Sequence, residues 1–312
     1  MRVADKWKDY ELLDCSSGQR LERWGDVILI RPDPQVIWKT EKTHPLWYKA
    51  HAVYNRSSSG GGKWDIRRKI KDAWKHAVYN RFSTGGGKWD IRRKIPDAWK
   101  IKYGDLSFMV KPMGFKHTGV FPEQAVNWDM TAEIIRKERR PLRVLNLFAY
   151  TGAATISALN AGAHVTHVDA SKGMVAWAKE NAAVSGLANE PVRWLVDDCM
   201  KFVEREIRRG NKYDIIIMDP PSYGRGPGGE VWKLEDAVYD FASLCTAVLS
   251  DDPVMVLINS YTTGLSASVM QYILGSTVSP LFGGKVTSDE IGLPVTASGL
   301  VLPCGASAVW RR

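Results

Sequence analysis

The sequence predicts an α/β fold, in which a smaller β-rich domain precedes a doubly wound parallel sheet. From residue 143 onward, apolar runs of strand length alternate with helical stretches, which is typical of strand–helix–strand units. Before residue 143 the apolar runs are short, β-prone and interrupted by Gly, Pro and Asp. Basic residues are concentrated in this first part. We therefore predict two domains, spanning residues 1–125 and 126–312.

The first domain is expected to contain short strands and a tandem repeat. The strand candidates are ILIRP (28–32), VIWK (36–39) and LSFMVKP (106–112). Residues 51–75 and 76–100 are identical at 22 of 25 positions. The differences are Ser57/Phe82, Ser59/Thr84 and Lys71/Pro96.

Each copy of the repeat is predicted to form a β-hairpin. In the first copy a β-prone stretch (51–56) and the alternating run KWDIRRKI (63–70) flank the glycine-rich turn SSSGGG. Two copies do not make a solenoid, which usually needs roughly three or more repeats. We interpret the pair as a tandem duplication. Because the second copy leads directly into IKYGDLSFMVKP, we expect it to be structural and the first copy to be a dispensable, non-catalytic insertion.

The second domain contains five apolar runs that are expected to be strands. They are RVLNLFA (143–149), HVTHVDA (164–170), VRWLVDD (192–198), YDIIIMD (213–219) and PVMVLINSY (253–261). Helical stretches lie between them, at residues 171–186 and 231–250 among others. In a sheet of this kind, ligands bind outside the carboxyl ends of the strands.

The composition is that of a soluble globular protein, with 45% hydrophobic and 25% charged residues in 312. No run resembles a signal peptide or approaches the roughly 18 apolar residues of a membrane span, so a cytoplasmic protein without a membrane partner is expected. The four cysteines lie far apart and form no C-x-x-C pair, so neither a disulfide framework nor a metal site is expected. The sequence leaves the oligomeric state open, with a homodimer as one alternative.

Charge is distributed unevenly along the chain. Residues 1–143 hold 30 Lys and Arg against 17 Asp and Glu, a balance of +13, whereas residues 144–312 hold 13 against 17, a balance of −4. A basic front half suggests contact with a polyanion, and a solvated basic surface is the alternative. Trp and Tyr are interleaved with the basic residues and can stack on bases, which favours nucleic acid.

Four successive strand ends carry residues suited to ligand binding. Gly152 opens a helix whose N-terminus can receive an anionic group. Asp169, about 20 residues further on, can accept both hydroxyls of a ribose. The third and fourth ends carry Asp197-Asp198 and DPPSY (219–223). A single Asp at a strand end is more often a helix cap or a turn residue, but four such ends in succession predict a binding site.

These motifs resemble those of class I S-adenosylmethionine-dependent methyltransferases, and within them the bacterial large-subunit (23S) ribosomal-RNA methyltransferase group. The resemblance rests on VLNLFAYTG (144–152), HVDAS (167–171), VDDC (196–199), DPPSY (219–223) and FKHTGVFPEQAVNW (115–128). It covers roughly residues 101–312. It implies a Rossmann-like, seven-stranded methyltransferase sheet, S-adenosylmethionine as the cofactor, and RNA (ribosomal RNA) as the partner.

The resemblance also implies roles for individual residues. Phe148 to Gly152 would wrap the methionine end of the cofactor, and Asp169 would bind the ribose hydroxyls. Asp198, or less strongly Asp197, would bind the adenine amino group, with Cys199 behind the ring. Lys116 to Gln124 would close over the methionine carboxylate. The complete set of expected cofactor residues is Lys116, Thr118, Phe121, Gln124, Asn146, Phe148, Ala149, Tyr150, Thr151, Gly152, Asp169, Ala170, Ser171, Asp197, Asp198, Cys199 and Asp219.

Two departures from the family pattern bear on the chemistry. The usual D-x-G-x-G-x-G loop is NLFAYTG here, so Asn146, Phe148 and Tyr150 replace the acid and two glycines. Methylation at carbon 5 of a pyrimidine needs a cysteine thiolate, usually at the fourth or fifth strand end. Neither DPPSYG nor INSYTTG (258–264) contains a cysteine, and Cys245 is expected within a helix. Direct transfer to a nitrogen or oxygen is therefore favoured.

The expected catalytic residues are Asp219, Pro220 and Tyr223. Asp219 or the Pro220 carbonyl could accept an amine hydrogen, and Tyr223 could stack on an extruded base or be a packed loop aromatic. The segment GRGPGGEVW (224–232) is either a substrate loop or an ordinary connection. Two other functions remain open: a methyltransferase for a small molecule or protein side chain, and a non-catalytic RNA-binding protein with a degenerate cofactor site.

Overall fold

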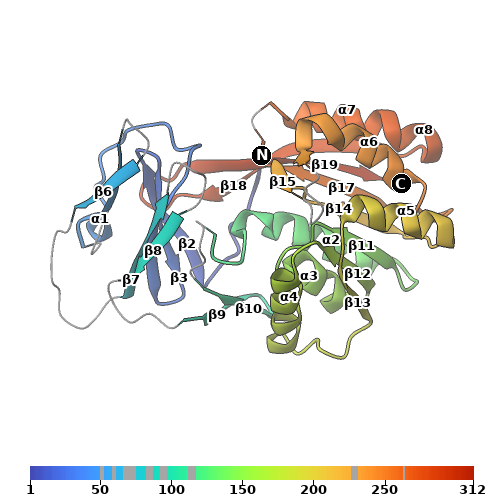
Figure 1. Ribbon diagram of the computed structural model, residues 1–312, viewed down its shortest axis with the longest axis horizontal. Helices are drawn as coiled ribbons and strands as arrows, with labels where there is room; N and C mark the ends of the chain where they lie inside the picture. Colours follow the sequence, from blue (N-terminus) through green and yellow to red (C-terminus); the bar gives the residue numbers. More distant parts are fainter. Residues whose placement is uncertain are drawn as a thin grey trace. The chain divides into compact units, whose positions relative to one another are not determined.

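The computed structural model describes residues 1–49, 53–57, 61–65, 75–81, 87–91, 97–111, 117–225, 231–262 and 264–312. The chain divides into two compact units (Figure 1). The sheet unit comprises Met1–Arg2, Gln124–Ile291 and Cys304–Arg312, and the front unit comprises Val3–Glu123 and Gly292–Pro303. Whether residues 1–125 and 126–312 are independently folding domains stays a prediction.

The sheet unit is built on eight strands in the order β1-β18-β19-β17-β14-β11-β12-β13. The neighbouring strands β17, β14, β11, β12 and β13 pair in parallel, and β19 pairs antiparallel with β17. The bounds are β1 Arg2–Val3, β11 Arg143–Leu147, β12 His164–Asp169, β13 Val192–Val196, β14 Ile215–Met218, β17 Met255–Ser260, β18 Lys285–Pro294 and β19 Val301–Arg311. The chain passes from β11 to β12 and β13 on one side, then to β14 on the other. The strand order therefore reverses beside β11, where sheets of this type bind ligands.

Helices cover both faces of this sheet (Figure 1). Helices α2, α3 and α4 lie on one face, and α5, α6 and α7 lie on the other. The bounds are α2 Ala125–Lys137, α3 Ala153–Asn160, α4 Lys172–Val184, α5 Cys199–Arg209, α6 Leu234–Thr246, α7 Ala267–Thr277 and α8 Ser279–Phe282. A short 3₁₀ turn, η1, spans Pro122–Gln124, and a hairpin of β15 (Tyr223–Arg225) and β16 (Val231–Lys233) follows β14.

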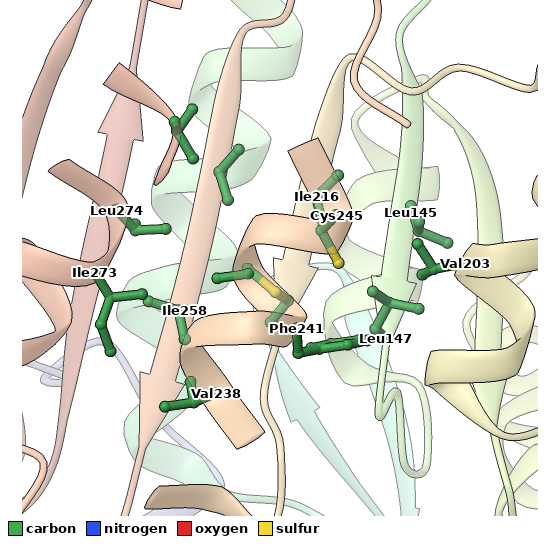
Figure 2. Packing of buried hydrophobic residues seen from close by; sticks show 14 of the residues in the cluster. Leu145, Leu147, Val203, Ile216, Val238, Phe241, Cys245, Ile258, Ile273 and Leu274 are labelled. Carbon is green, nitrogen blue, oxygen red and sulfur yellow. The ribbon is translucent and has the colours of Figure 1, made fainter. Parts of the chain in front are cut away.

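A large hydrophobic cluster of the sheet unit lies between the sheet and the layer of α5, α6 and α7. Figure 2 shows Phe241 and Cys245 of α6 among side chains of the central strands, such as Leu147 of β11 and Ile258 of β17. These strand residues are at most 1% exposed. Parallel strands that are covered on both faces need continuous apolar runs, which explains why their sequences do not alternate. Burial of these side chains fixes the strand ends that carry the site.

The front unit contains the β-rich part of the chain. Its main sheet has the order β2-β3-β4-β7-β8, and β9 pairs with β10. Segment 292–303 belongs to this unit, because Thr296 and Ala297 donate backbone hydrogen bonds to Leu12 and Leu13. The bounds are β2 Tyr10–Ser16, β3 Gln19–Trp24, β4 Val27–Pro32, α1 Pro45–Lys49, β5 Val53–Ser57, β6 Gly61–Asp65, β7 Lys75–Arg81, β8 Gly87–Ile91, β9 Trp99–Tyr103 and β10 Leu106–Val110.

Both copies of the repeat form antiparallel strand pairs, as predicted. Strands β5 and β6 of the first copy make a two-stranded sheet of their own. Strands β7 and β8 of the second copy continue the main sheet, because β7 pairs in parallel with β4. Of the predicted first turn, Ser57 ends β5 and Gly61 and Gly62 begin β6, so the strands extend further into it than expected. Residues 58–60 and 82–86 and the ends of the KWDIRRKI runs lie outside the described residues. The second copy is thus integrated into the main sheet, whereas the first is not.

The structure differs from the sequence prediction in several features, and its large sheet has eight strands where the resemblance implies seven. Residues 36–39 (VIWK) form no strand, so that prediction is wrong. Buried Val36 donates its N–H to Asp33 and Trp38 donates its ring N–H to Cys15, and these contacts shape an irregular segment. The sheet is not wholly parallel, because β19 is antiparallel to β17. Strands β2 and β3 were not predicted, since charged residues interrupt their apolar positions.

Candidate active site

Asp169, the last residue of β12, joins three of the four predicted strand ends. Its Oδ2 accepts the N–H of Tyr150 at 2.8 Å, and its Oδ1 accepts the N–H of Ser171 at 2.8 Å. Its backbone carbonyl accepts the N–H of Asp197 at 3.0 Å. Burial raises the pKa of this carboxyl above its ordinary value of 3.8, and the two N–H groups oppose the shift. The carboxylate is held rigidly between the loop after β11 and the start of α4.

The loop after β11 keeps the backbone conformation of a glycine-rich loop without the glycines. Phe148 has a φ of 55° and Tyr150 has a φ of 51°, both in the left-handed region. These are two of the three positions at which the family pattern has glycine, and Gly152 is the third. A non-glycine residue in this region costs about 1–2 kcal/mol. Hydrogen bonds at Phe148 N to Cys199 Sγ (3.3 Å) and Ala149 N to Val168 O (3.0 Å) help to hold the loop in this shape.

Gly152 ends the loop and begins α3. Its φ is 84°, and a Cβ placed there would lie 2.8 Å from the Cβ of Ala178 in α4. Only glycine meets both requirements. Buried Asn181 of α4 donates to the carbonyl of Thr151 at 2.9 Å, which fixes the same junction from the other side. The loop, α3 and α4 therefore form one tightly packed corner.

Asn146 of β11 supports the loop through hydrogen bonds in the interior. It is buried, and its Nδ2 donates to Thr155 Oγ1 at 2.9 Å. Thr155 Oγ1 in turn lies 2.9 Å from Nδ1 of His167, a fully buried residue. Burial lowers the pKa of His167 to about 3, so this histidine is neutral in the fold. The side-chain amide nitrogen of Asn146 is thus engaged in the interior, beneath the loop.

The third strand end combines the predicted residues with local helix capping. Asp198 caps α5 by accepting the N–H of Lys201 at 2.9 Å, and Asp197 pairs with Arg205. Cys199 follows as the first residue of α5 and is buried beneath Phe148 N. The structure therefore brings Asp197, Asp198 and Cys199 to the same edge as Asp169.

The fourth strand end is braced by bonds from neighbouring elements. Asn259 of β17 donates to Asp219 Oδ1 at 2.9 Å, and Thr262 donates to the Ser222 hydroxyl at 2.5 Å. Trp232 of β16 donates its ring N–H to the Pro221 carbonyl at 2.8 Å. The Trp232 ring also packs against Phe148, with centroids 5.2 Å apart. DPPSY is thereby linked to the loop after β11.

The remaining predicted residues differ in their surroundings. Pro220 is buried, whereas Tyr223 is 53% exposed, so Tyr223 is not packed in the interior. Ala170 is exposed beside Ser171, whose hydroxyl caps α4. The segment 226–230 lies outside the described residues.

The stretch FKHTGVFPEQ divides between the two units. Lys116 lies outside the described residues, and Thr118 and Phe121 belong to the front unit. There the buried Thr118 accepts the N–H of Lys111 through its carbonyl at 3.0 Å, and Phe121 lies against His117 with ring centroids 4.9 Å apart. Gln124 is the first residue of this segment in the sheet unit and donates to the Tyr261 hydroxyl at 2.9 Å.

Sequence reasoning did not identify the residues that support these groups. Asn259, Ser307 and Asn127 form a buried polar chain that leads to Asp219. Trp232 bridges DPPSY and Phe148. One signal was available, since Asn259 is the first polar residue after the apolar run MVLI and occupies a buried strand position.

The arrangement suits a nucleoside cofactor with a charged amino-acid end. Each oxygen of the Asp169 carboxylate already accepts one N–H, and each retains a second lone pair that can accept a ribose hydroxyl. The tight turn at Gly152 leads directly into α3. The N-terminus of this helix favours the binding of a carboxylate. Asp169 and Gly152 therefore fit S-adenosylmethionine, and the cofactor roles expected of the other residues at this edge stay predictions. These residues are Phe148, Ala149, Tyr150, Thr151, Asp197, Asp198 and Cys199.

Comparisons with known proteins bear on the family of this chain. Residues 81–234 match the family model described as S-adenosylmethionine-dependent methyltransferase. A solved structure of a SAM-dependent methyltransferase from Agrobacterium tumefaciens is 33% identical, with a TM-score of 0.83. The match covers 99% of this chain and 92% of that one.

Curated relatives match a shorter stretch. A protein of Shewanella baltica named ribosomal RNA large subunit methyltransferase K/L is 36% identical over 123 residues, and one of Shewanella oneidensis with the same name is 35% identical over 123 residues. Each match covers 39% of this chain and only 16% of the relative. The similarity to the Agrobacterium protein, in contrast, extends over nearly the whole of both chains. The chain belongs to the S-adenosylmethionine-dependent methyltransferases.

Proposed function

We propose that this protein methylates RNA, and ribosomal RNA in particular, at a nitrogen or oxygen by direct transfer. The observation that carries the proposal is the pairing of a methyltransferase site with a front half whose charge balance is +13. Phosphate neutralisation by Lys and Arg supplies much of the affinity for nucleic acid. The names of the Shewanella relatives point to the same class of substrate.

Direct transfer is supported by the state of the cysteines. All four are buried thiols that form no disulfide bond. Burial raises the pKa of the Cys15 thiol to about 11 and raises those of Cys199 and Cys245 well above the ordinary range. A nucleophilic cysteine needs an accessible thiolate, which these surroundings oppose. We therefore infer that no covalent cysteine adduct forms.

Residues at the fourth strand end would align the acceptor. S-adenosylmethionine supplies an electrophilic methyl group when bound, so the protein mainly has to orient the attacking atom. Asp219 or the Pro220 carbonyl would accept a hydrogen from the acceptor group. Tyr223, with 53% of its surface exposed, is available to stack on an extruded base.

A degenerate cofactor site is disfavoured by the loop itself. Phe148 and Tyr150 stand where the family pattern has glycine, and both hold left-handed backbone angles that favour glycine. A chain that no longer needed this loop would gain stability by relaxing these angles. The retention of strain at both positions therefore supports a binding function.

Mass analysis of ribosomal RNA from cells with and without the gene tests the proposal. We expect one RNA fragment to be lighter by one methyl group when the gene is absent, and the mass to be restored by the wild-type gene. Restoration by a gene that encodes Asp219→Ala is not expected. Identical fragment masses in the two strains would reject ribosomal RNA as the substrate.

A further inference from the structure

A chain of buried polar side chains runs from the start of α2 to Asp219. Asn127 Nδ2 donates to Ser307 Oγ at 3.0 Å, Ser307 Oγ donates to Asn259 Oδ1 at 2.7 Å, and Asn259 Nδ2 donates to Asp219 Oδ1 at 2.9 Å. Asn259 and Ser307 are fully buried, and Asn127 is 4% exposed. These residues come from α2, β19 and β17, so the series of hydrogen bonds connects elements that are distant in sequence.

The chain has one direction of donation, and the Asp219 carboxylate determines it. An ionised carboxylate only accepts hydrogen bonds, so Asn259 must turn its NH₂ group toward Asp219. Asn259 Oδ1 then faces Ser307, which must donate its single hydroxyl hydrogen there. The lone pairs of Ser307 are left for Asn127, which must present its NH₂ group. Every orientation follows from the charge at Asp219.

The same amide of Asn127 continues to the neighbouring strand end. Its Nδ2 also donates to Gln124 Oε1 at 2.7 Å, and Gln124 Nε2 donates to the Tyr261 hydroxyl at 2.9 Å. The Tyr261 ring lies close over Gly305, where a Cβ would come within 3.0 Å of it. Asp219 and Tyr261, which follow β14 and β17, are therefore joined through one buried network.

Stability alone does not account for this network. The positions of Asn259 and Ser307 are within the sheet, where apolar side chains would fill the space without buried polar groups. The required orientation also leaves Asn127 Oδ1 with no hydrogen-bond partner among the described residues, at a cost to the fold. A network that is retained despite this cost is best explained by the group at its end.

We infer that Asn259, Ser307 and Asn127 are positioning residues that hold the Asp219 carboxylate in the orientation required by the methyl acceptor. The inference rests on the proposed place of Asp219 in the acceptor site. None of the three residues has to touch substrate. They act through Asp219, so their loss should reduce turnover without weakening cofactor binding.

The test compares Ser307→Ala with a matched control, Ser157→Ala. Ser157 is also buried in the sheet unit and donates one hydrogen bond, to the Trp128 carbonyl at 3.2 Å, but it is not part of the network. With tritiated S-adenosylmethionine and ribosomal RNA from cells lacking the gene, Ser307→Ala should lower kcat about tenfold. Its KM, and the Kd for S-adenosylmethionine, should stay within about threefold of wild type. Ser157→Ala should keep the wild-type kcat, and Ser307→Thr, which retains the hydroxyl, should recover most of it.

A double variant shows whether Ser307 acts through Asn259. Asn259→Leu removes the donor to Asp219 and should also lower kcat about tenfold. If the effect of Ser307 passes through Asn259, Asn259→Leu/Ser307→Ala will be no slower than Asn259→Leu alone. Additive losses, near a hundredfold in total, would mean that the residues act independently and would overturn the inference.

A crystal structure of Ser307→Ala gives a result that does not depend on the substrate. We expect the Asn259 amide, no longer held by Ser307, to shift and its contact with Asp219 Oδ1 to lengthen beyond 2.9 Å, with the contact preserved in Ser157→Ala. An unchanged contact at 2.9 Å in Ser307→Ala would overturn the inference even if the RNA proves to be a substrate. Wild-type protein that binds cofactor but labels no RNA would instead reject the proposed function.

Discussion

Phe148 and Tyr150 show how the same backbone can be built from different residues. Both residues have positive φ angles, which glycine adopts most readily, and the family pattern has glycine at both positions, yet both carry aromatic side chains. The Phe148 ring packs against Trp232 and Phe241, which glycine could not do. The sequence predicts a strand end and a helix start at NLFAYTG, which the structure confirms, and the role of this loop in cofactor binding stays a prediction. Its φ angles and its aromatic packing on β16 and α6 could not be inferred from the amino-acid sequence.

Asp169 is expected to contribute directly to cofactor affinity. Asp169→Ala removes the proposed acceptor for the ribose hydroxyls and should weaken S-adenosylmethionine binding by at least about tenfold. Asp251→Ala, a change at an exposed site, is the control and should bind normally. Calorimetric titration measures both, and an unchanged Kd in Asp169→Ala would place the ribose elsewhere.

The pH dependence of the wild-type protein follows from the direction of the Asp169 shift. Burial raises its pKa, and the ionised carboxylate is the form that accepts hydroxyls, so affinity should fall as the pH drops through the raised value. The same shift contributes folding stability below the unfolded pKa, and that contribution is lost as the pH rises through the folded pKa. Calorimetry from neutral to mildly acidic pH should therefore show a loss of binding above the ordinary aspartate value of 3.8. Binding that persists down to that value would contradict the assignment.

The packing of α3 against α4 depends on Gly152. Gly152→Ala would strain a φ of 84° and also bring a Cβ to 2.8 Å from Ala178. Gly162→Ala is the matched control, since its φ is 94° but nothing lies within 4 Å. We expect Gly162→Ala to lower the free energy of unfolding of the protein by about 1–2 kcal/mol. Gly152→Ala should lose about 1–3 kcal/mol more, because two helices must separate. Urea denaturation distinguishes the two, and equal losses would mean that the close approach is unimportant.

The duplicated hairpin is expected to be dispensable in one copy. Deletion of 51–75 should leave the melting temperature and cofactor affinity nearly unchanged, because β5 and β6 form a separate sheet. Removal of the extra 25 residues changes the entropic cost of loop closure, and so the free energy of unfolding, by only about a kcal/mol. Deletion of 76–100 leaves almost the same sequence, differing at the three variable positions, and serves as the comparison. A protein that unfolds after both deletions would show that two hairpins are required.

Elements were predictable from sequence where one physical signal dominated. The strands β11, β12, β14 and β17 were predicted because continuous apolar runs mark strands buried on both faces. The apolar residues of VRWLV also predicted β13, although none of its residues is fully buried. Strand β19 was not, since VLPCGASAVWR mixes small and polar residues that its buried antiparallel position accepts. The support of Asp219 was also hidden, because Asn127, Asn259 and Ser307 are far apart in the chain and meet only across the folded sheet.

The uneven charge of the molecule predicts where RNA is held. Lys100 and Lys102 are exposed on β9 of the front unit, and Lys179 and Arg208 are exposed on α4 and α5 of the sheet unit. Changing each pair to Glu lowers the net charge equally. We expect the front variant to bind RNA more weakly. The slope of the logarithm of its binding constant against the logarithm of salt concentration should become shallower by about 0.7–0.9 for each phosphate that is no longer neutralised. The full chain is used because segment 292–303 belongs to the front unit. Equal weakening in the two variants would remove the argument from charge.

Transfer of a labelled methyl group from S-adenosylmethionine to ribosomal RNA tests the account most directly. Purified protein is incubated with tritiated cofactor and ribosomes from cells lacking the gene, and the label is followed through ribonuclease and protease digestion. We predict label that ribonuclease releases and protease does not, with little transfer by Asp219→Ala. Label that follows the protein fraction, or equal labelling of RNA by Asp219→Ala, would contradict the account.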